Sequence, residues 1–324
     1  MSNFSTLCII GNGFDIHHGI ASAYAKFRDW LKHNDKFAYR LLNDLYGRPD
    51  NVWWSDFENN LANVDEDGYP KRLAKLDYWG VRDRLETYYK KDGLDFIDGL
   101  EDSGVDCYNN HKLLPEVASF EMSKFKEVLT SNFSKWITSL KYPPNISELR
   151  IVLPENAFFI NFNYTNTLED IYGIDEDSVA HLHGYIGQSK YDEFIIGHGM
   201  TASEMSERNL EENAWKNKDP MKDDNGAGDV IIELFDVIES ELKKHVDEVI
   251  HKFRSDFDAL RGIMNVETYG FSFSPIDLPY LDEVIKVAGN DISFKVGCHT
   301  NKDKIRAKEY FLRNGIEKYN LVEF

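Results

Sequence analysis

The sequence predicts an α/β fold, a Rossmann-like and mainly parallel sheet with a large helical insertion, forming one domain over residues 1–324. Two observations predict it. Short apolar runs rich in β-branched and aromatic residues, typical of buried strands, alternate with stretches of helical periodicity. One long helical stretch interrupts that alternation. The runs that predict strands are Thr6–Ile10, Ala157–Phe162, Val179–His183, Glu193–Ile196, Met264–Tyr269 and Ile292–Val296.

Composition limits the partners of the chain. It has 37 Lys and Arg residues against 56 Asp and Glu, a net charge of −19, with 42% hydrophobic residues. This charge disfavours binding to the phosphates of nucleic acid, and no apolar run is long enough to span a membrane. Cys8, Cys107 and Cys298 are too scattered for a disulfide framework or a Cys-x-x-Cys zinc module. We therefore expect a cytoplasmic protein with no nucleic-acid or membrane partner and no metal.

Helical patterns fill two further parts of the chain. Residues 27–150 form the predicted insertion, in which Ser55-x-x-Glu58 resembles a capping box that begins a helix. A second pattern from Asp229 to Arg261 predicts a helix about 45 Å long. Its apolar stripe is longer than one small sheet can cover, so we expect a homo-oligomer. The polar, turn-rich residues 201–228 before it predict a lid or surface excursion.

A glycine-rich turn follows the first strand. The residues expected to hold a pyrophosphate there are Gly11, Asn12, Gly13, Phe14 and Gly19. Backbone N–H groups at such a strand-to-helix turn bind phosphate in many α/β proteins. Ile16 stands where a dinucleotide motif requires its third glycine. A purely structural turn is therefore the alternative.

Polar residues follow the Ala157–Phe162 strand. They are Asn161, Asn163, Thr165 and Asn166. Ligands of open parallel sheets bind at the carboxyl ends of strands, so this is where we expect chemistry. Helix capping is an equally good account of each of these side chains.

Histidines follow the next predicted strand. His181 and His183 share one strand face, and His183 stands at the strand's exit, where it could accept a proton. Together with His198 they suggest a metal cluster, although no carboxylate falls at a diagnostic spacing. We expect His17 and His18 to be surface or loop residues.

A glycine and small hydroxyl residues follow the Met264–Tyr269 strand. Gly270, Ser272 and Ser274 would allow a ribose or phosphate to approach closely. The alternative is a helix start, with Ser274 as the cap and Pro275 at the first helical position.

As a set, these motifs resemble the AbiH-type family of bacterial abortive-infection proteins, and more distantly the NAD-binding core of sirtuins. The motifs are Gly11-Asn-Gly-Phe-Asp15, Phe162-Asn-Tyr-Thr165, His181-Leu-His-Gly184 and Tyr269-Gly-Phe-Ser272. In the sirtuin pattern the first glycine motif is followed after three residues by Gly-Ile-Pro, and here by Gly19-Ile-Ala. Thr165 departs from the Asp of sirtuins, and three dispersed cysteines cannot build the zinc module of the deacylases.

The resemblance implies a sirtuin-like fold and a role in phage defence. It further implies NAD+ glycohydrolase activity that releases nicotinamide, with NAD+ as the substrate and a phage protein as a trigger. Asn163 would hold the ribose or water, and His183 would act as general base. Asp15 could favour the ribosyl cation electrostatically, and helix capping is an equally good account of this residue. Two alternatives stay open. The first is a nucleotide-binding or phage-sensing module without catalysis, and the second is a metal-dependent hydrolase built on His181, His183 and His198.

Overall fold

The computed structural model describes residues 4–65, 68–188, 194–199, 229–230, 241–289 and 291–324. The chain divides into two compact units. The first unit comprises Met1–Phe27, Phe133–Ile196 and Lys244–Phe324, and the second comprises Arg28–Asn132 and Gly197–Lys243. The predicted insertion at 27–150 thus overlaps the second unit, while residues 133–150 belong to the first. The predicted lid at 201–228 lies outside the described residues.

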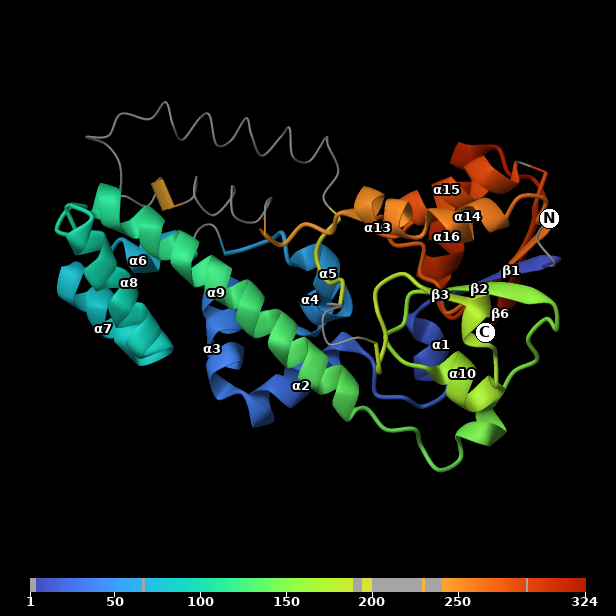
Figure 1. Ribbon diagram of the computed structural model, residues 1–324, viewed down its shortest axis with the longest axis horizontal. Coiled ribbons are helices and arrows are strands. Elements are labelled where there is room, and N and C mark those ends of the chain that lie inside the picture. Colours follow the sequence, from blue (N-terminus) through green and yellow to red (C-terminus); the bar gives the residue numbers. More distant parts are fainter. Residues whose placement is uncertain (1–3, 66–67, 189–193, 200–228, 231–240, 290) are drawn as a thin grey trace. The chain divides into compact units, whose positions relative to one another are not determined.

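The first unit contains a six-stranded sheet in the order β3-β2-β1-β4-β5-β6 (Figure 1). All five strand pairs are parallel, which confirms the α/β prediction. The strands are β1 (Thr6–Ile10), β2 (Ala157–Asn161), β3 (Val179–His181), β4 (Asn265–Tyr269), β5 (Ser293–Cys298) and β6 (Tyr319–Glu323). The strand order reverses direction at β1, so the ends of β1, β2 and β4 meet where open α/β sheets bind ligands.

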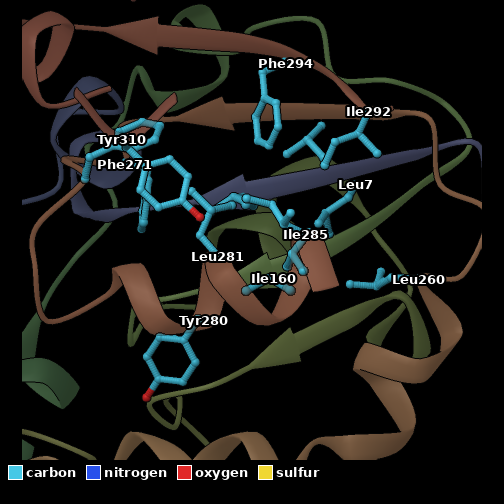
Figure 2. Packing of buried hydrophobic residues seen from close by; sticks show 14 of the residues in the cluster. Leu7, Ile160, Leu260, Phe271, Tyr280, Leu281, Ile285, Ile292, Phe294 and Tyr310 are labelled. Carbon is cyan, nitrogen blue, oxygen red and sulfur yellow. The ribbon is translucent and has the colours of Figure 1, made fainter. Parts of the chain in front are cut away.

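Helices cover both faces of this sheet. Leu7 and Ile9 of β1 pack into one cluster with α13 (Val246–Lys252), α14 (Arg254–Ala259), α15 (Leu278–Ala288) and α16 (Asn301–Asn314). Figure 2 shows part of this cluster, including Leu281 and Ile285 of α15. Cys8 and Ile10 point to the other face, toward α1 (Asn12–His17) and α10 (Thr167–Tyr172). The alternation follows from the period of two along a strand.

The central strands match their predicted positions closely, and the edges of the sheet do not. The predicted Val179–His183 strand already ends at His181, and residues 194–196 of the predicted Glu193–Ile196 strand are not in a strand. The sequence does not predict β6, whose residues are exposed or half-buried and form no apolar run. A central strand is buried on both faces and is therefore recognisable as an apolar run, whereas an edge strand is partly exposed and need not form one.

The prediction of one long helix from Asp229 to Arg261 is wrong. The chain leaves helical geometry at residues 242–245, before α13 begins at Val246. There Lys243 forms a parallel β-bridge with His198, whose N–H donates to the Leu242 carbonyl over 2.8 Å. Backbone pairing with another segment therefore overrides the helical period of the side chains.

The helices of the second unit form a cluster of their own. They include α3 (Lys36–Leu45), α4 (Asn51–Ser55), α5 (Phe57–Asn60), α6 (Gly68–Leu73), α7 (Tyr78–Tyr89) and α8 (Lys91–Asp102). Helices α2 (Tyr24–Asn34) and α9 (Asn110–Ser139) carry the chain between the two units. Two short 3-10 helices, η1 (Ile146–Leu149) and η2 (Glu176–Ser178), lie in the first unit. Among the described residues, no helix is long and apolar enough to cross a bilayer.

The capping box predicted at Ser55 is also wrong. Asp50 caps α4 by accepting a hydrogen bond from the Trp53 N–H, and the Ser55 hydroxyl donates back to the Val52 carbonyl. Ser55 is thus the last residue of one short helix rather than the start of another.

Candidate functional site

The glycine-rich turn after β1 is locked against the loop after β4. The N–H groups of Gly11 and Gly13 donate to the carbonyls of Tyr269 and Gly270, both over 3.0 Å. A Cβ on Gly11 would lie 2.5 Å from the Gly270 oxygen, and one on Gly270 would lie 2.1 Å from the Phe14 nitrogen. The three glycines are therefore required by close backbone packing. In this arrangement the Gly11 and Gly13 N–H groups are already bonded within the protein.

The other residues of this turn support the same structure. The Asn12 amide donates to the Ser22 carbonyl over 3.1 Å and accepts from the Ser22 hydroxyl over 2.6 Å. Phe14 is fully buried beneath the sheet's second face. Gly19 has a φ of 72°, in the left-handed region that favours glycine. These contacts fix the path of the chain around Asp15.

Asp15 is the buried acid of the site. It is 1% exposed, and its carboxylate accepts hydrogen bonds from the hydroxyls of Thr165 over 2.6 Å and Thr167 over 2.9 Å. Burial disfavours the charged form and raises its pKa to about 6, although these hydrogen bonds and the nearby Asn163 and His181 oppose the rise. At neutral pH the site therefore holds a buried and mostly ionised carboxylate.

Asn163 lies immediately after β2 beside this acid. Its side chain is buried, at 3% exposure, and neither its amide nitrogen nor its amide oxygen makes a well-formed hydrogen bond within the described residues. The Asn163 N–H donates to the Asn161 side-chain oxygen over 2.9 Å, which holds the backbone in place. The Asn163 amide is also close enough to Asp15 to favour the carboxylate form. A buried amide whose hydrogen-bonding capacity is largely unused is costly, so this side chain is suited to a polar ligand.

His181 forms a pair with Glu169 on the same side. Its Nε2 lies 2.7 Å from a carboxylate oxygen of Glu169, and its Nδ1 lies 3.4 Å from the Asn161 amide nitrogen. No pattern in the sequence predicts that Glu169 and Thr167, which follow β2 on α10, belong to the site. Both residues are far from the glycine motif along the sequence, so no local pattern relates them to Asp15.

His183 faces the other side of the sheet, so the prediction that it shares a face with His181 is wrong. Its ring packs against Phe162 at a centroid distance of 5.1 Å and against Tyr280 at 5.7 Å. The cause is that β3 ends at His181, so the alternation of a strand does not extend to His183. His183 also contacts Tyr164 at 6.2 Å. It therefore touches the residues on both sides of Asn163.

The His183 ring is buried and neutral. Burial and the positive charge of Lys244 hold its pKa well below the usual 6.5. One ring nitrogen bonds to the Phe162 backbone, while Nε2 is buried without a hydrogen-bond partner among the described residues. Nε2 is therefore available as a hydrogen-bond acceptor, but it is a weak base.

His18 is not the surface residue predicted. It is fully buried, with Nδ1 2.7 Å from the Phe14 carbonyl and Nε2 2.7 Å from the Tyr172 hydroxyl.

Ser274 and Pro275 do not start α15, because Asp277 is its N-cap and Leu278 its first residue. Ser272 is exposed and Ser274 is buried.

Two small pockets border the site. The first, of about 150 Å³, is lined by Ile20, Thr138, Leu140, Lys141, Tyr142, Thr165, Asn166, Asp170 and Ile186. The second, of about 140 Å³, is lined by Asn166, Glu169, Glu176, Val179, His181, Tyr185 and Phe253. Asn166 lies between them and lines both. Among the described residues, no group of three or more His, Cys, Asp or Glu side chains is arranged to hold a metal ion.

The comparison that decides the family covers most of the chain. The model of the family described as bacteriophage abortive infection AbiH matches residues 7–296, a range that includes the sheet from β1 into β5 and both pockets. The chain belongs to the AbiH family. It is therefore a protein of abortive infection, the defence in which bacteria resist bacteriophage. Searches of curated proteins and of solved structures found no match to this AbiH chain.

Proposed function

We propose that this AbiH protein contributes to defence by hydrolysing NAD+ at the carboxyl ends of β1 and β2. The observation that carries the proposal is the Asn163 amide, which is buried within reach of the Asp15 carboxylate and makes no well-formed hydrogen bond to any residue that the structure describes. One amide donor and one acceptor match the hydroxyl groups of a ribose, which can both accept and donate. Binding a ribose would satisfy a polar group that the protein alone leaves unsatisfied.

The charges suit cleavage of a ribosyl bond. Departure of nicotinamide neutralises its pyridinium ring, so the leaving group requires no acid, and positive charge develops on the ribose. The Asp15 carboxylate supplies a negative charge in a buried environment, where electrostatic stabilisation is strong. Water then adds to the ribose carbon and gives up a proton, leaving nicotinamide and ADP-ribose.

The pKa shifts of the two groups favour Asp15 over His183 as the acceptor of that proton. The pKa of Asp15 is raised to about 6, whereas that of His183 is held well below 6.5. A base is most effective when its pKa is near the working pH. We therefore assign proton acceptance to Asp15. His183 Nε2 would accept a hydrogen bond from a ribose hydroxyl or from the attacking water.

The pocket lined by Thr165 is suited to the leaving group. Thr165 bonds to Asp15 and also borders the pocket of about 150 Å³, a volume that accommodates a six-membered ring. We propose that nicotinamide occupies it. The phosphate- and ribose-binding roles expected for Gly11, Asn12, Gly13, Phe14, Gly19, Gly270, Ser272 and Ser274 stay predictions.

The test is release of nicotinamide from NAD+ by the purified protein, measured by chromatography. We expect Asn163→Ala to lower turnover by roughly 10² or more while NAD+ affinity changes by less than about tenfold. Asn145→Ala is the matched control, because Asn145 is exposed and its side chain caps nothing. Equal activity of Asn163→Ala and Asn145→Ala would contradict the proposal. NAD+ binding without turnover by the wild type would instead favour a sensing module.

A phage protein trigger and a homo-oligomer also stay predictions. The continuous helix that suggested the oligomer is broken at residues 242–245, so that reason no longer supports it. Light scattering tests it directly, because a monomer has a mass of 37.6 kDa.

A further inference from the structure

The pocket beside β3, which we call the His181 pocket, is lined by two residues that each have a buried side-chain oxygen without a hydrogen-bond partner among the described residues. It has a volume of about 140 Å³. The carboxylate oxygen Oε2 of Glu169 and the amide oxygen Oδ1 of Asn166 are both buried, and neither accepts a hydrogen bond within the described part of the chain. Both residues line the pocket. NAD+ cleavage as proposed above uses neither atom.

Each of these two oxygens belongs to a carboxylate or amide group whose other polar atom is hydrogen-bonded to the protein. Glu169 Oε1 lies 2.7 Å from His181 Nε2, and the Asn166 amide nitrogen donates to the Ile186 carbonyl over 2.8 Å. These bonds orient Oε2 and Oδ1 without using them. The His181 side chain is itself 8% exposed, so the carboxylate is anchored from within the protein. Both oxygens therefore keep the capacity to accept a hydrogen bond from a ligand with N–H or O–H donors.

The charged groups and aromatic rings that line the pocket indicate which class of ligand it can bind. Glu176 adds a second carboxylate to Glu169, and among the described residues that line the pocket there is no Lys or Arg. Tyr185 stacks on His181 at a ring distance of 4.5 Å, and Phe253 contributes a further aromatic ring. Aromatic faces and carboxylates together favour cations, because both present negative potential.

We propose that the His181 pocket binds an N–H-donating cation, a guanidinium or primary ammonium group. A pocket of about 140 Å³ admits a group of about five or six non-hydrogen atoms. Guanidinium and ammonium groups offer several N–H donors, enough for Glu169 Oε2 and Asn166 Oδ1 at once. The group belongs either to a free small molecule or to the tip of an arginine side chain.

The test uses the whole purified chain and small probes in 150 mM salt, with ligand-observed NMR on their methyl signals. Methylguanidinium and butylammonium should bind at one site with dissociation constants of about 1–10 mM, as expected for ligands of this size. N-methylurea keeps the shape of methylguanidinium without its charge, and tetramethylammonium keeps the charge without N–H donors. Both should bind at least about tenfold more weakly, because charge-assisted hydrogen bonds are the stronger ones. Equal binding of all four probes, or no binding of any, would overturn the proposal.

Two variants connect binding to the pocket. Glu169→Gln retains an oxygen for the His181 N–H and should weaken methylguanidinium binding at least about tenfold. Glu155→Gln removes the same charge from an exposed position of the first unit and should change it less than about twofold. Equal weakening in both variants would show general attraction to a chain of net charge −19 and would refute a specific site.

Val179→Phe provides a second line of evidence, because it fills the pocket without removing a charge. It should abolish binding of both cationic probes, and retained binding would overturn the proposal.

N-acetylarginine methylamide distinguishes the two sources of the cation. Binding of this compound together with methylguanidinium points to an arginine side chain, and binding of methylguanidinium alone points to a free molecule.

Discussion

Replacing Asp15 by Asn should stabilise the protein at neutral pH and abolish the proposed chemistry. The folded state raises the pKa of Asp15 from 3.8 to about 6, mainly because burial disfavours the charge. Each pKa unit is worth about 1.36 kcal/mol, so the ionised carboxylate costs the folded state about 3 kcal/mol. Asparagine removes this cost and keeps an oxygen that can accept from one of the two threonine hydroxyls.

The effect has a defined pH dependence. Below pH 3.8 Asp15 is protonated in both states, and its contribution is the same as that of a neutral group. Between pH 3.8 and about 6 the unfolded chain ionises first, so the wild type loses stability as the pH rises. Above about pH 6 the loss is complete. The advantage of Asp15→Asn should therefore be small at pH 4 and reach up to about 3 kcal/mol at pH 8, less the value of one weakened hydrogen bond.

Urea unfolding of both proteins at pH 4, 5, 6, 7 and 8 measures this difference. If the gap between the two unfolding free energies is the same at pH 4 and pH 8, Asp15 has no raised pKa and the reasoning is wrong. The activity assay gives an independent check. Nicotinamide release by the wild type should rise with pH, reach half of its maximum near pH 6 and level off at higher pH, because only the carboxylate form accepts a proton.

Two further predictions concern stability. Gly270→Ala should cost more than about 3 kcal/mol, because its φ is 62° and its Cβ would lie 2.1 Å from a backbone nitrogen. Gly173→Ala, with a φ of 68° but no atom within 4 Å of its Cβ, should cost only about 1 kcal/mol, and equal losses on urea unfolding would refute the role of close packing. In the second unit, Glu121→Ala should cost about 3–5 kcal/mol, because Glu121 is fully buried and accepts two hydrogen bonds from Arg84. Glu116→Ala on the same helix is the exposed control, and a melting temperature no lower for Glu121→Ala than for Glu116→Ala would contradict this account.

The family and the general function were within reach of the sequence, whereas the detailed chemistry was not. Short glycine, asparagine and histidine motifs in a fixed order indicated the AbiH family, which the family model confirms over residues 7–296. The likeness to sirtuins stays a prediction. Asn163 and Thr165 were predicted at the site because polar residues after a parallel strand always lie at the ligand-binding edge.

Hydrogen bonds between residues that are far apart in the sequence explain the features that the sequence did not predict. Asp15 and Thr165 are 150 residues apart, so no local pattern reveals that they share a hydrogen bond. The same distance hides the burial of His18, whose ring bonds to Tyr172 of α10. Likewise, Gly11 and Gly13 matched a phosphate-binding turn, but their N–H groups are bonded to the loop after β4. A local motif does not show which of its backbone N–H donors are hydrogen-bonded to other parts of the folded protein.

The sequence by itself determined the parallel sheet, because β1 and β2 are nearly continuous apolar runs buried along their whole length, and because the strand-forming segments alternate with helical ones. It did not determine β6 or the break at residues 242–245, where backbone hydrogen bonds to distant segments outweigh local periodicity. Only the tertiary structure decided the electrostatics of the site. Burial of Asp15 and of the Asn163 amide depends on segments that meet only after folding, and this burial raises the pKa of Asp15 and makes unused hydrogen-bonding capacity of Asn163 costly.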